Sequence, residues 1–392
     1  MAASIALNLY MALPLMVTVM SRGYSDYSGL YLAGRIVTDH QSRYLYNYGA
    51  QLAFKKQLFG DPHPGIPFNH AAYEALLFAP LSRLPFASSL YVWSLVNVLL
   101  LLAMAKVLRP FLTSSIRRLD LVLLCLSLAF APVGVTLMQG QDSILDLLLF
   151  ALVFAAFKRG RELWAGVFLA LTLFKWPFVM PFVPLLLVQR EWKALRGFLA
   201  AAAGLISLSL AITGIAAVKD YIALVRMEAN IDNAPVMANV RGLLTMFHLG
   251  PETTKVLALV IGAGLFLVPL LMAFRMKLDG QRGTAFDLIF ALTMTVAVAG
   301  GYHVFMHDLS LLLLPLFVVA NYLFERRRWK TLAALSFFFT IQIYIYFFGG
   351  QNISLLAVPV LALAAGIAIE IRKITPVTSP DAKQQLAPPA AV

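Results

Sequence analysis

The stretch that decides the fold is residues 119–157, which read LDLVLLCLSLAFAPVGVTLMQGQDSILDLLLFALVFAAF. Two apolar runs, 119–137 and 143–157, are separated by little more than Gln139, Gly140, Gln141 and Asp142. About 20 apolar residues cross a hydrocarbon core of roughly 30 Å, so the first run is long enough and the second is short. The stretch predicts two neighbouring membrane helices joined by a polar turn.

The composition of the whole chain agrees with a membrane environment. Of 392 residues, 60% are hydrophobic and 13% are charged, and the mean hydropathy is +0.81. A soluble domain carries roughly 25% charged residues. The net charge of +12 suggests cytoplasmic loops facing anionic lipid rather than a nucleic-acid partner. The single cysteine, Cys125, lies in an apolar run, which excludes a disulfide framework or a cysteine metal site.

Apolar runs along the chain predict an all-α polytopic membrane protein with about 10–12 transmembrane helices. We expect residues 1–373 to form one transmembrane domain and residues 374–392 to form a disordered cytoplasmic tail. Residues 2–20 lack a basic n-region and a clear cleavage site, so we expect them to be a retained first span rather than a signal peptide. The expected spans are 2–20, 86–108, 119–137, 143–157, 195–218, 251–275, 284–301, 309–323, 330–348 and 353–371.

The positions of the basic residues give the orientation. With the N-terminus in the cytoplasm, most of the 31 Lys and Arg residues fall in the inner loops, as the positive-inside rule requires. Both termini are then cytoplasmic, and the unusual polar segments lie on the outer face. For a bacterial source, this is the periplasmic face of the inner (plasma) membrane.

Residues 163–188 do not fit a simple span, because basic clusters that should both be cytoplasmic flank them. Their middle is Phe174-Lys175-Trp176-Pro177, and proline interrupts a helix. Non-helical backbone at membrane depth is tolerated only where it is buried in protein or lines a polar cavity. We expect a re-entrant pair or two short tilted spans, with Lys175 either at the break or snorkelling to an interface.

Four polar segments are expected on the outer face, where they can converge. The first, residues 21–85, is expected to contain interfacial helices and includes Asp26, Asn69, His70 and Glu74. The second is the turn from Gln139 to Asp142. The third is residues 219–250, and the fourth runs from Tyr302 to Asp308.

The order of several short motifs resembles glycosyltransferase family 87 over roughly residues 20–330. The motifs are Asp26, Tyr31-Leu32-Ala33-Gly34, Leu45-Tyr46, Ala75-Leu76-Leu77-Phe78-Ala79-Pro80-Leu81, Leu84-Pro85, Trp93, Gly140-Gln141, Arg159-Gly160, Ala165-Gly166 and Lys175-Trp176-Pro177. The resemblance implies a GT-C-type bundle that uses a polyprenyl-phosphate sugar, typically mannose, in glycolipid synthesis. The family pattern usually has Tyr-Pro-Pro before the Ala-Leu-Leu stretch, whereas this chain has Phe68-Asn69-His70, a difference that bears on acceptor or donor choice.

The resemblance implies the catalytic base and points to the region from His303 to Asp308, and the chemistry of the transfer suggests the other candidates. The outer-loop carboxylate is the catalytic base, which falls on Asp26, and the reaction inverts the anomeric centre. A prenyl phosphate is already a good leaving group, so we expect no metal or other cofactor. Candidates for donor phosphate or sugar binding are Arg241, His303, His307 and Lys175. Candidates for acceptor or sugar contacts are Gln141, Asp142, Asn69, His70, Glu74 and Asp308.

Simpler interpretations compete with these roles. In the simpler interpretation, Asp26 and Asp142 are helix N-caps without a catalytic or binding role. Asp146 is expected to be a buried hydrogen-bonded group. His303 and His307, four residues apart, share a face if they lie on a helix, and that spacing also suits a metal.

A different class of protein also fits part of the pattern. Many spans, a Pro-broken helix and intramembrane charges describe a polytopic transporter or flippase of lipid-linked sugars. Such proteins often contain two similar halves, and this sequence contains no such duplication. The expected partners are therefore a polyprenyl-phosphate-linked sugar, a glycolipid or glycan acceptor, and membrane lipids. The donor sugar is expected to be mannose, with arabinofuranose as the nearest rival.

Overall fold

The computed structural model describes residues 25–60, 67–113, 118–229, 233–276, 282–348 and 352–374. All regular secondary structure in these residues is helical, which confirms the all-α prediction. The expected first span, 2–20, and residues 375–392 of the expected tail lie outside the described residues.

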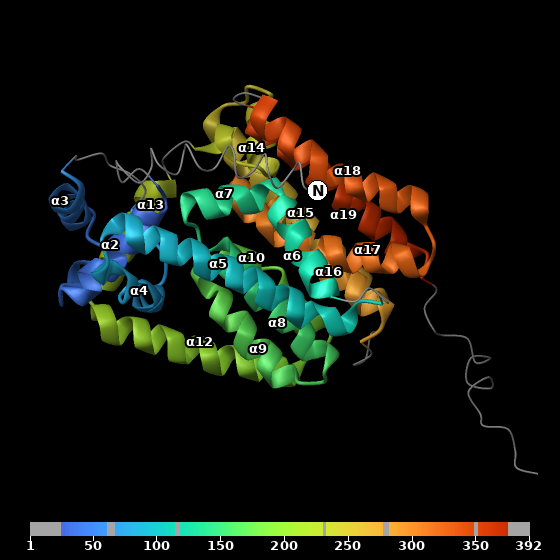
Figure 1. The fold of residues 1–392 in the computed structure, drawn as a ribbon, viewed down its shortest axis with the longest axis horizontal. Helices are drawn as coiled ribbons and strands as arrows, with labels where there is room; N and C mark the ends of the chain where they lie inside the picture. The colour runs from blue at the N-terminus through green and yellow to red at the C-terminus, as the bar shows by residue number, and fades with distance from the viewer. Residues whose placement is uncertain are drawn as a thin grey trace, which may run out of the picture.

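The first half of the chain forms short helices at one end and longer helices beyond them (Figure 1). The elements are α2 (Tyr27–Thr38), η1 (Ser42–Tyr44), α3 (Tyr48–Phe59), α4 (Ala72–Phe78), η2 (Leu81–Arg83), α5 (Phe86–Leu108), η3 (Arg109–Phe111), α6 (Leu119–Ala129), α7 (Ala131–Gln139), α8 (Ser143–Lys158), α9 (Glu162–Leu171), η4 (Thr172–Lys175), α10 (Trp176–Val179) and α11 (Phe182–Val188). The symbol η marks 3₁₀-helices.

The second half adds most of the remaining apolar helices. Its elements are α12 (Trp192–Thr213), α13 (Ala217–Ala229), η5 (Ala234–Val236), α14 (Val240–Thr245), α15 (Pro251–Met276), α16 (Thr284–Gly300), η6 (Met306–Leu312), α17 (Leu313–Glu325), α18 (Trp329–Phe348), η7 (Ile353–Leu356) and α19 (Ala357–Arg372).

Six helical stretches of the described chain are long and apolar enough to cross a membrane, and the bent pair α6 and α7 makes a seventh. The expected spans 143–157, 284–301 and 330–348 fall on α8, α16 and α18, which are not among these six. The expected single span 119–137 is wrong in detail, because α6 and α7 meet at an angle of 74°. Pro132, at the start of α7, has no N–H to continue the helical hydrogen bonds.

The segment near Lys175 changes helix type, but Glu162–Val179 is one of the six stretches that could cross a membrane, and it is not a bent pair. Helix α9 ends at Leu171, a 3₁₀ turn covers Thr172–Lys175, and α10 contains only four residues, Trp176–Val179. The expected span 195–218 ends earlier, because α12 stops at Thr213 and α13 begins at Ala217.

Helix α16 is the central element of the bundle. Every residue from Leu288 to Ala299 is buried, and α15, α17 and α19 pack around it. Helix α15 instead exposes large apolar side chains, including Leu259, Leu271 and Phe274. A helix that is buried all round belongs in a core, whereas an outer helix with an apolar surface is suited to contact with lipid.

The first outer segment packs into the protein rather than lying over it. Helix α2 is buried almost throughout, and Tyr27, Leu32 and Phe78 form a second core with Ala217 and Leu224 of α13. Figure 1 shows α2, α3 and α4 with α13 at the same end of the molecule. The short helices expected in residues 21–85 are present, but α2 is a core element.

The end of the bundle that lies away from the turn at Asp142 carries ion pairs between basic loops and acidic residues. Helix α8 has 16 residues and runs from Ser143 to Lys158, about 24 Å at 1.5 Å per residue. Lys158 Nζ lies 2.8 Å from Asp287 Oδ1, and Arg282 pairs with Glu191 at 2.7 Å. The helix bundle therefore separates these basic loops from the polar turn at Asp142.

Candidate active site

The structure joins the described parts of the four polar segments. Asp26 and His70 of the first segment contact the turn at Gln141 and Asp142. This turn contacts the fourth segment through Gln139 and His307. The third segment reaches the fourth through hydrogen bonds from Ala238 N to Val304 O (2.8 Å) and from Asn239 Nδ2 to Gly301 O (2.6 Å). The predicted convergence is confirmed.

Asp26 lies where α2 begins, and its carboxylate accepts a hydrogen bond from Gln141. Gln141 Nε2 lies 2.9 Å from Asp26 Oδ2. Although Asp26 occupies the N-cap position of α2, its side chain makes no capping hydrogen bond. The carboxylate is half-buried, so it is held by the fold and remains partly accessible.

Gly140 makes this contact possible. Its φ of +66° ends α7 in the left-handed region, and a Cβ placed there would lie 2.7 Å from Tyr27 Cβ and 2.6 Å from Leu90 Cδ1. Gly140 O accepts a hydrogen bond from Trp93 Nε1 at 3.0 Å. Only glycine combines this backbone conformation with such a close approach, which places Gln141 beside Asp26.

His70, Glu74 and Asp142 form a compact group beside this contact. His70 Nδ1 lies 2.7 Å from Glu74 Oε2 and 3.3 Å from Asp142 Oδ2. Burial alone would lower the pKa of His70, but the two carboxylates raise it to about 10. Burial raises the pKa of Glu74 to about 7, against the effect of His70. Despite burial, Lys175 and His70 hold the pKa of Asp142 well below its usual range.

Lys175 connects this group to the fourth polar segment. Its Nζ lies 2.7 Å from Asp142 Oδ1, 2.7 Å from Asp308 Oδ1 and 2.7 Å from Ser143 Oγ. Asp308 Oδ2 accepts a hydrogen bond from Phe305 N at 3.0 Å. Asp142 is the N-cap residue of α8 but makes no capping hydrogen bond. We call His70, Glu74, Asp142, Lys175 and Asp308 the ionic network.

The two histidines of the fourth segment do not share a helix face. Helix η6 begins at Met306, so His303 lies before it and His307 lies within it. His307 Nδ1 hydrogen-bonds with Gln139 Oε1 at 2.8 Å. Burial and the charge of Arg241 lower the pKa of His303 to about 4, so His303 is neutral near pH 7.

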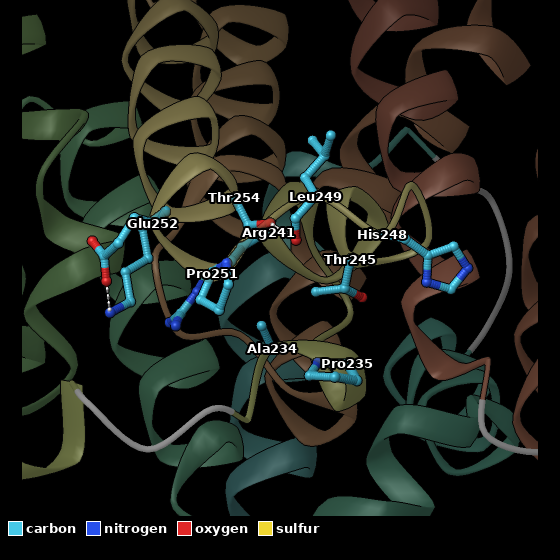
Figure 2. Close-up of a pocket in the computed structure, with 10 residues that line it drawn as sticks. Ala234, Pro235, Arg241, Thr245, His248, Leu249, Pro251, Glu252 and Thr254 are labelled. Carbon is cyan, nitrogen blue, oxygen red and sulfur yellow. Dashed lines mark hydrogen bonds and ion pairs between the residues drawn. The ribbon is translucent and has the colours of Figure 1, made fainter.

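Arg241 is buried beside a cavity of about 670 Å³. Its guanidinium carbon lies 4.2 Å from the centroid of the Tyr302 ring. Its Nε and Nη1 have no hydrogen-bond partner among the described residues. Figure 2 shows the side chains that line the cavity, namely Ala234, Pro235, Arg241, Thr245, His248, Leu249, Pro251, Glu252, Thr254 and Lys255. Arg241 therefore lines the cavity with a guanidinium group that has two buried, unpaired nitrogens.

Some residues near the site have no signal in the sequence. Lys55 of α3 is buried, and burial lowers its pKa to about 8 while the charge of Asp26 acts in the opposite direction. Ser143 contacts both Lys175 and Asp308. Asn69, which the sequence did predict as a contact, is half-buried next to His70. A lysine or serine in a polar segment carries no sign of these contacts, because the partners lie far away in the sequence.

The region contains a half-buried carboxylate, Asp26, and the ionic network beside its partner Gln141. The cavity at Arg241 is lined by other residues and does not include Asp26 or the ionic network. A carboxylate can accept a proton from a hydroxyl group. A buried arginine can stabilise a phosphate.

Comparison with known proteins identifies the family. No curated protein matches the chain. The sequence model of glycosyltransferase family 87 matches residues 73–299, more than half of the chain. The matched residues include all of α4 except Ala72, together with the turn at Gln141, Lys175 and Arg241, whereas Asp26 lies before the match. The chain therefore belongs to glycosyltransferase family 87.

Proposed function

We propose that this membrane glycosyltransferase moves a sugar from a polyprenyl phosphate to a hydroxyl group of a lipid or glycan on the outer face of the membrane. The observation that carries the proposal is the hydrogen bond between Gln141 and Asp26 at the meeting point of the polar segments. It supports a carboxylate fixed in position for chemistry rather than a residue that only solvates a loop.

Asp26 is the proposed base. Its carboxylate takes the proton of the acceptor hydroxyl while the acceptor oxygen attacks the anomeric carbon. The bond between that carbon and the phosphate oxygen breaks, and the electron pair leaves with the polyprenyl phosphate. This single displacement inverts the anomeric centre, so a β-linked donor gives an α-linked product.

Arg241 is the strongest candidate for binding the donor phosphate. It is buried, two of its nitrogens lack partners among the described residues, and it lines the cavity. His303 lies in the electrostatic field of Arg241 and would act as a neutral hydrogen-bond donor. Lys175 and His307 are already engaged with protein groups. We propose that Lys175 supports the site through the ionic network and His307 through its hydrogen bond with Gln139.

Mannose is the preferred donor sugar, with arabinofuranose as the rival. Asn69 and His70 occupy the region where the sequence departs from the usual family pattern. We propose that these residues, with Gln141, Asp142, Glu74 and Asp308, shape the acceptor side of the site.

The test uses the purified full-length chain in lipid nanodiscs with a membrane glycolipid acceptor. Radiolabelled polyprenyl-phosphate-mannose, polyprenyl-phosphate-arabinofuranose and GDP-mannose are compared, and NMR gives the anomeric configuration of the product. Transfer from a polyprenyl-phosphate donor with inversion supports the proposal. Transfer from GDP-mannose alone, or retention of configuration, contradicts it. Movement of the intact lipid-linked sugar from one leaflet of a vesicle membrane to the other, without transfer of the sugar to an acceptor, would favour the flippase alternative.

A further inference from the structure

His70, Glu74 and Asp142 place one imidazole and two carboxylates around a common point. The ligand atoms of the three side chains all lie within 4.8 Å of one another. They come from the start of α4 and from the turn between α7 and α8, so the tertiary fold brings them together. Nitrogen and oxygen ligands bind Zn²⁺ at about 2.0–2.2 Å, which puts ligands of one ion roughly 3–3.5 Å apart. Small side-chain movements would produce that spacing.

The charge of this region favours a cation. Glu74, Asp142, Asp146 and Asp308 are all buried, whereas Lys175 is shared between Asp142 and Asp308. Burying charges without compensation is costly. Among the described residues, Lys175 and His70 are the two cations beside these carboxylates. A dication bound in place of the His70 proton would add one positive charge to the cluster.

Unpaired oxygen atoms provide a second, independent observation. Glu74 is fully buried, and its Oε1 has no hydrogen-bond partner among the described residues. Asp146, four residues after Asp142 on α8, is also fully buried, and neither of its carboxylate oxygens has a partner in the described part of the chain. Buried polar atoms are normally paired with protein, water or an ion.

We propose that His70, Glu74 and Asp142 form a binding site for a divalent transition-metal ion such as Mn²⁺. Lys175 holds Asp142 Oδ1, which leaves Oδ2 on the side of His70. The side chain of His70 is 25% exposed, which gives an ion and its water ligands access to the site. The metal would fix the turn that carries Gln141, so it would act on the position of Asp26. This inference departs from the sequence-based expectation that no metal is involved, and it does not depend on the donor sugar.

The test measures Mn²⁺ binding to the purified full-length chain after treatment with EDTA. Loss of the free Mn²⁺ signal in electron paramagnetic resonance gives the affinity, and electron spin-echo modulation detects an imidazole nitrogen bound to the ion. We expect a single saturable site with nitrogen modulation. His70→Gln should abolish the modulation, and Glu74→Gln should weaken binding by at least about 10–100-fold.

The matched control is the variant His40→Gln with Asp39→Asn, which removes the same residue types from an exposed part of the first segment. It should bind Mn²⁺ like the wild type. Absence of saturable binding to the folded wild type would overturn the proposal, as would unchanged nitrogen modulation in folded His70→Gln. If that variant does not fold, absence of nitrogen modulation in the wild type overturns the proposal by itself. Because the readout is binding, a failure here is distinguishable from a failure of sugar transfer.

Discussion

Gln141 and Asp26 are 115 positions apart in the chain, yet the amide nitrogen of Gln141 lies 2.9 Å from the carboxylate of Asp26. Gly140 allows this contact through its left-handed backbone and its close approach to Tyr27. The hydrogen bond gives a defined direction to a carboxylate that is otherwise at the edge of the described fold.

Replacing Gln141 with Leu should lower kcat and leave KM for the donor nearly unchanged, because the amide positions the base and does not hold the phosphate. Hydrogen bonds to charged groups contribute about 1.5–3 kcal/mol, so we expect a loss of roughly 10–100-fold. Steady-state transfer kinetics measure it. Gln57→Leu, at an exposed position of α3, is the control. A rise in KM with unchanged kcat would count against the positioning role.

Arg241→Gln should raise KM for the polyprenyl-phosphate donor, because the cavity loses its buried cation. Arg241→Lys should recover only part of the affinity, since a lysine keeps the charge but not the planar set of donors. Donor titration in nanodiscs measures both variants. The control is Arg226→Gln, at an exposed residue of α13. Equal donor affinity in wild type and Arg241→Gln would refute the assignment.

Lys175→Met should reduce the free energy of unfolding by about 3–5 kcal/mol, because it leaves buried carboxylates without their cation. Adding Asp308→Asn in the same chain should restore part of the loss, since one of those carboxylates is then neutral. Denaturant unfolding in detergent micelles tests this, with the exposed Lys106→Met as control. A loss no larger than the control would show that the ionic network does not stabilise the fold.

The lowered pKa of His303 predicts how the free energy of unfolding changes with pH. Its folded pKa is about 4, below the ordinary value of 6.5, so the unfolded chain binds the proton more readily in this window. Stability should therefore fall as the pH drops from 6.5 toward 4. Asp308 acts against this shift and Arg241 reinforces it.

Replacing His303 with Asn should make the apparent Tm less sensitive to pH between 6.5 and 4.5. The exposed His40→Asn variant controls for loss of a histidine. An identical pH slope in wild type and His303→Asn would contradict this explanation.

Much of the architecture follows from the sequence. Apolar runs predicted the helices, and the basic loops predicted which polar segments share a face. The meeting of Asp26, Gln141 and His307 in one region agrees with that prediction. The bend between α6 and α7 was missed because apolar composition continues through Phe130, while Pro132 interrupts only the backbone hydrogen bonds.

The partners within the site were harder to predict. His70, Asp142, Lys175 and Asp308 lie far apart in the chain, and their pairing depends on how α4, α8, η4 and η6 pack. His303 and His307 would share a face only if one helix covered both, and η6 starts only at Met306. Spacing identifies a shared face only when the helix extends over both residues.

The most direct test of the central claim is transfer of radiolabelled mannose from polyprenyl-phosphate-mannose by wild type, Asp26→Asn and Asp39→Asn. Asp26→Asn keeps the size of the side chain and removes the base, so we expect transfer to fall by about 10²–10⁴-fold. Asp39, an exposed carboxylate just beyond α2, should be dispensable. Wild-type rates in folded Asp26→Asn would show that Asp26 is not the base and would contradict the proposed mechanism.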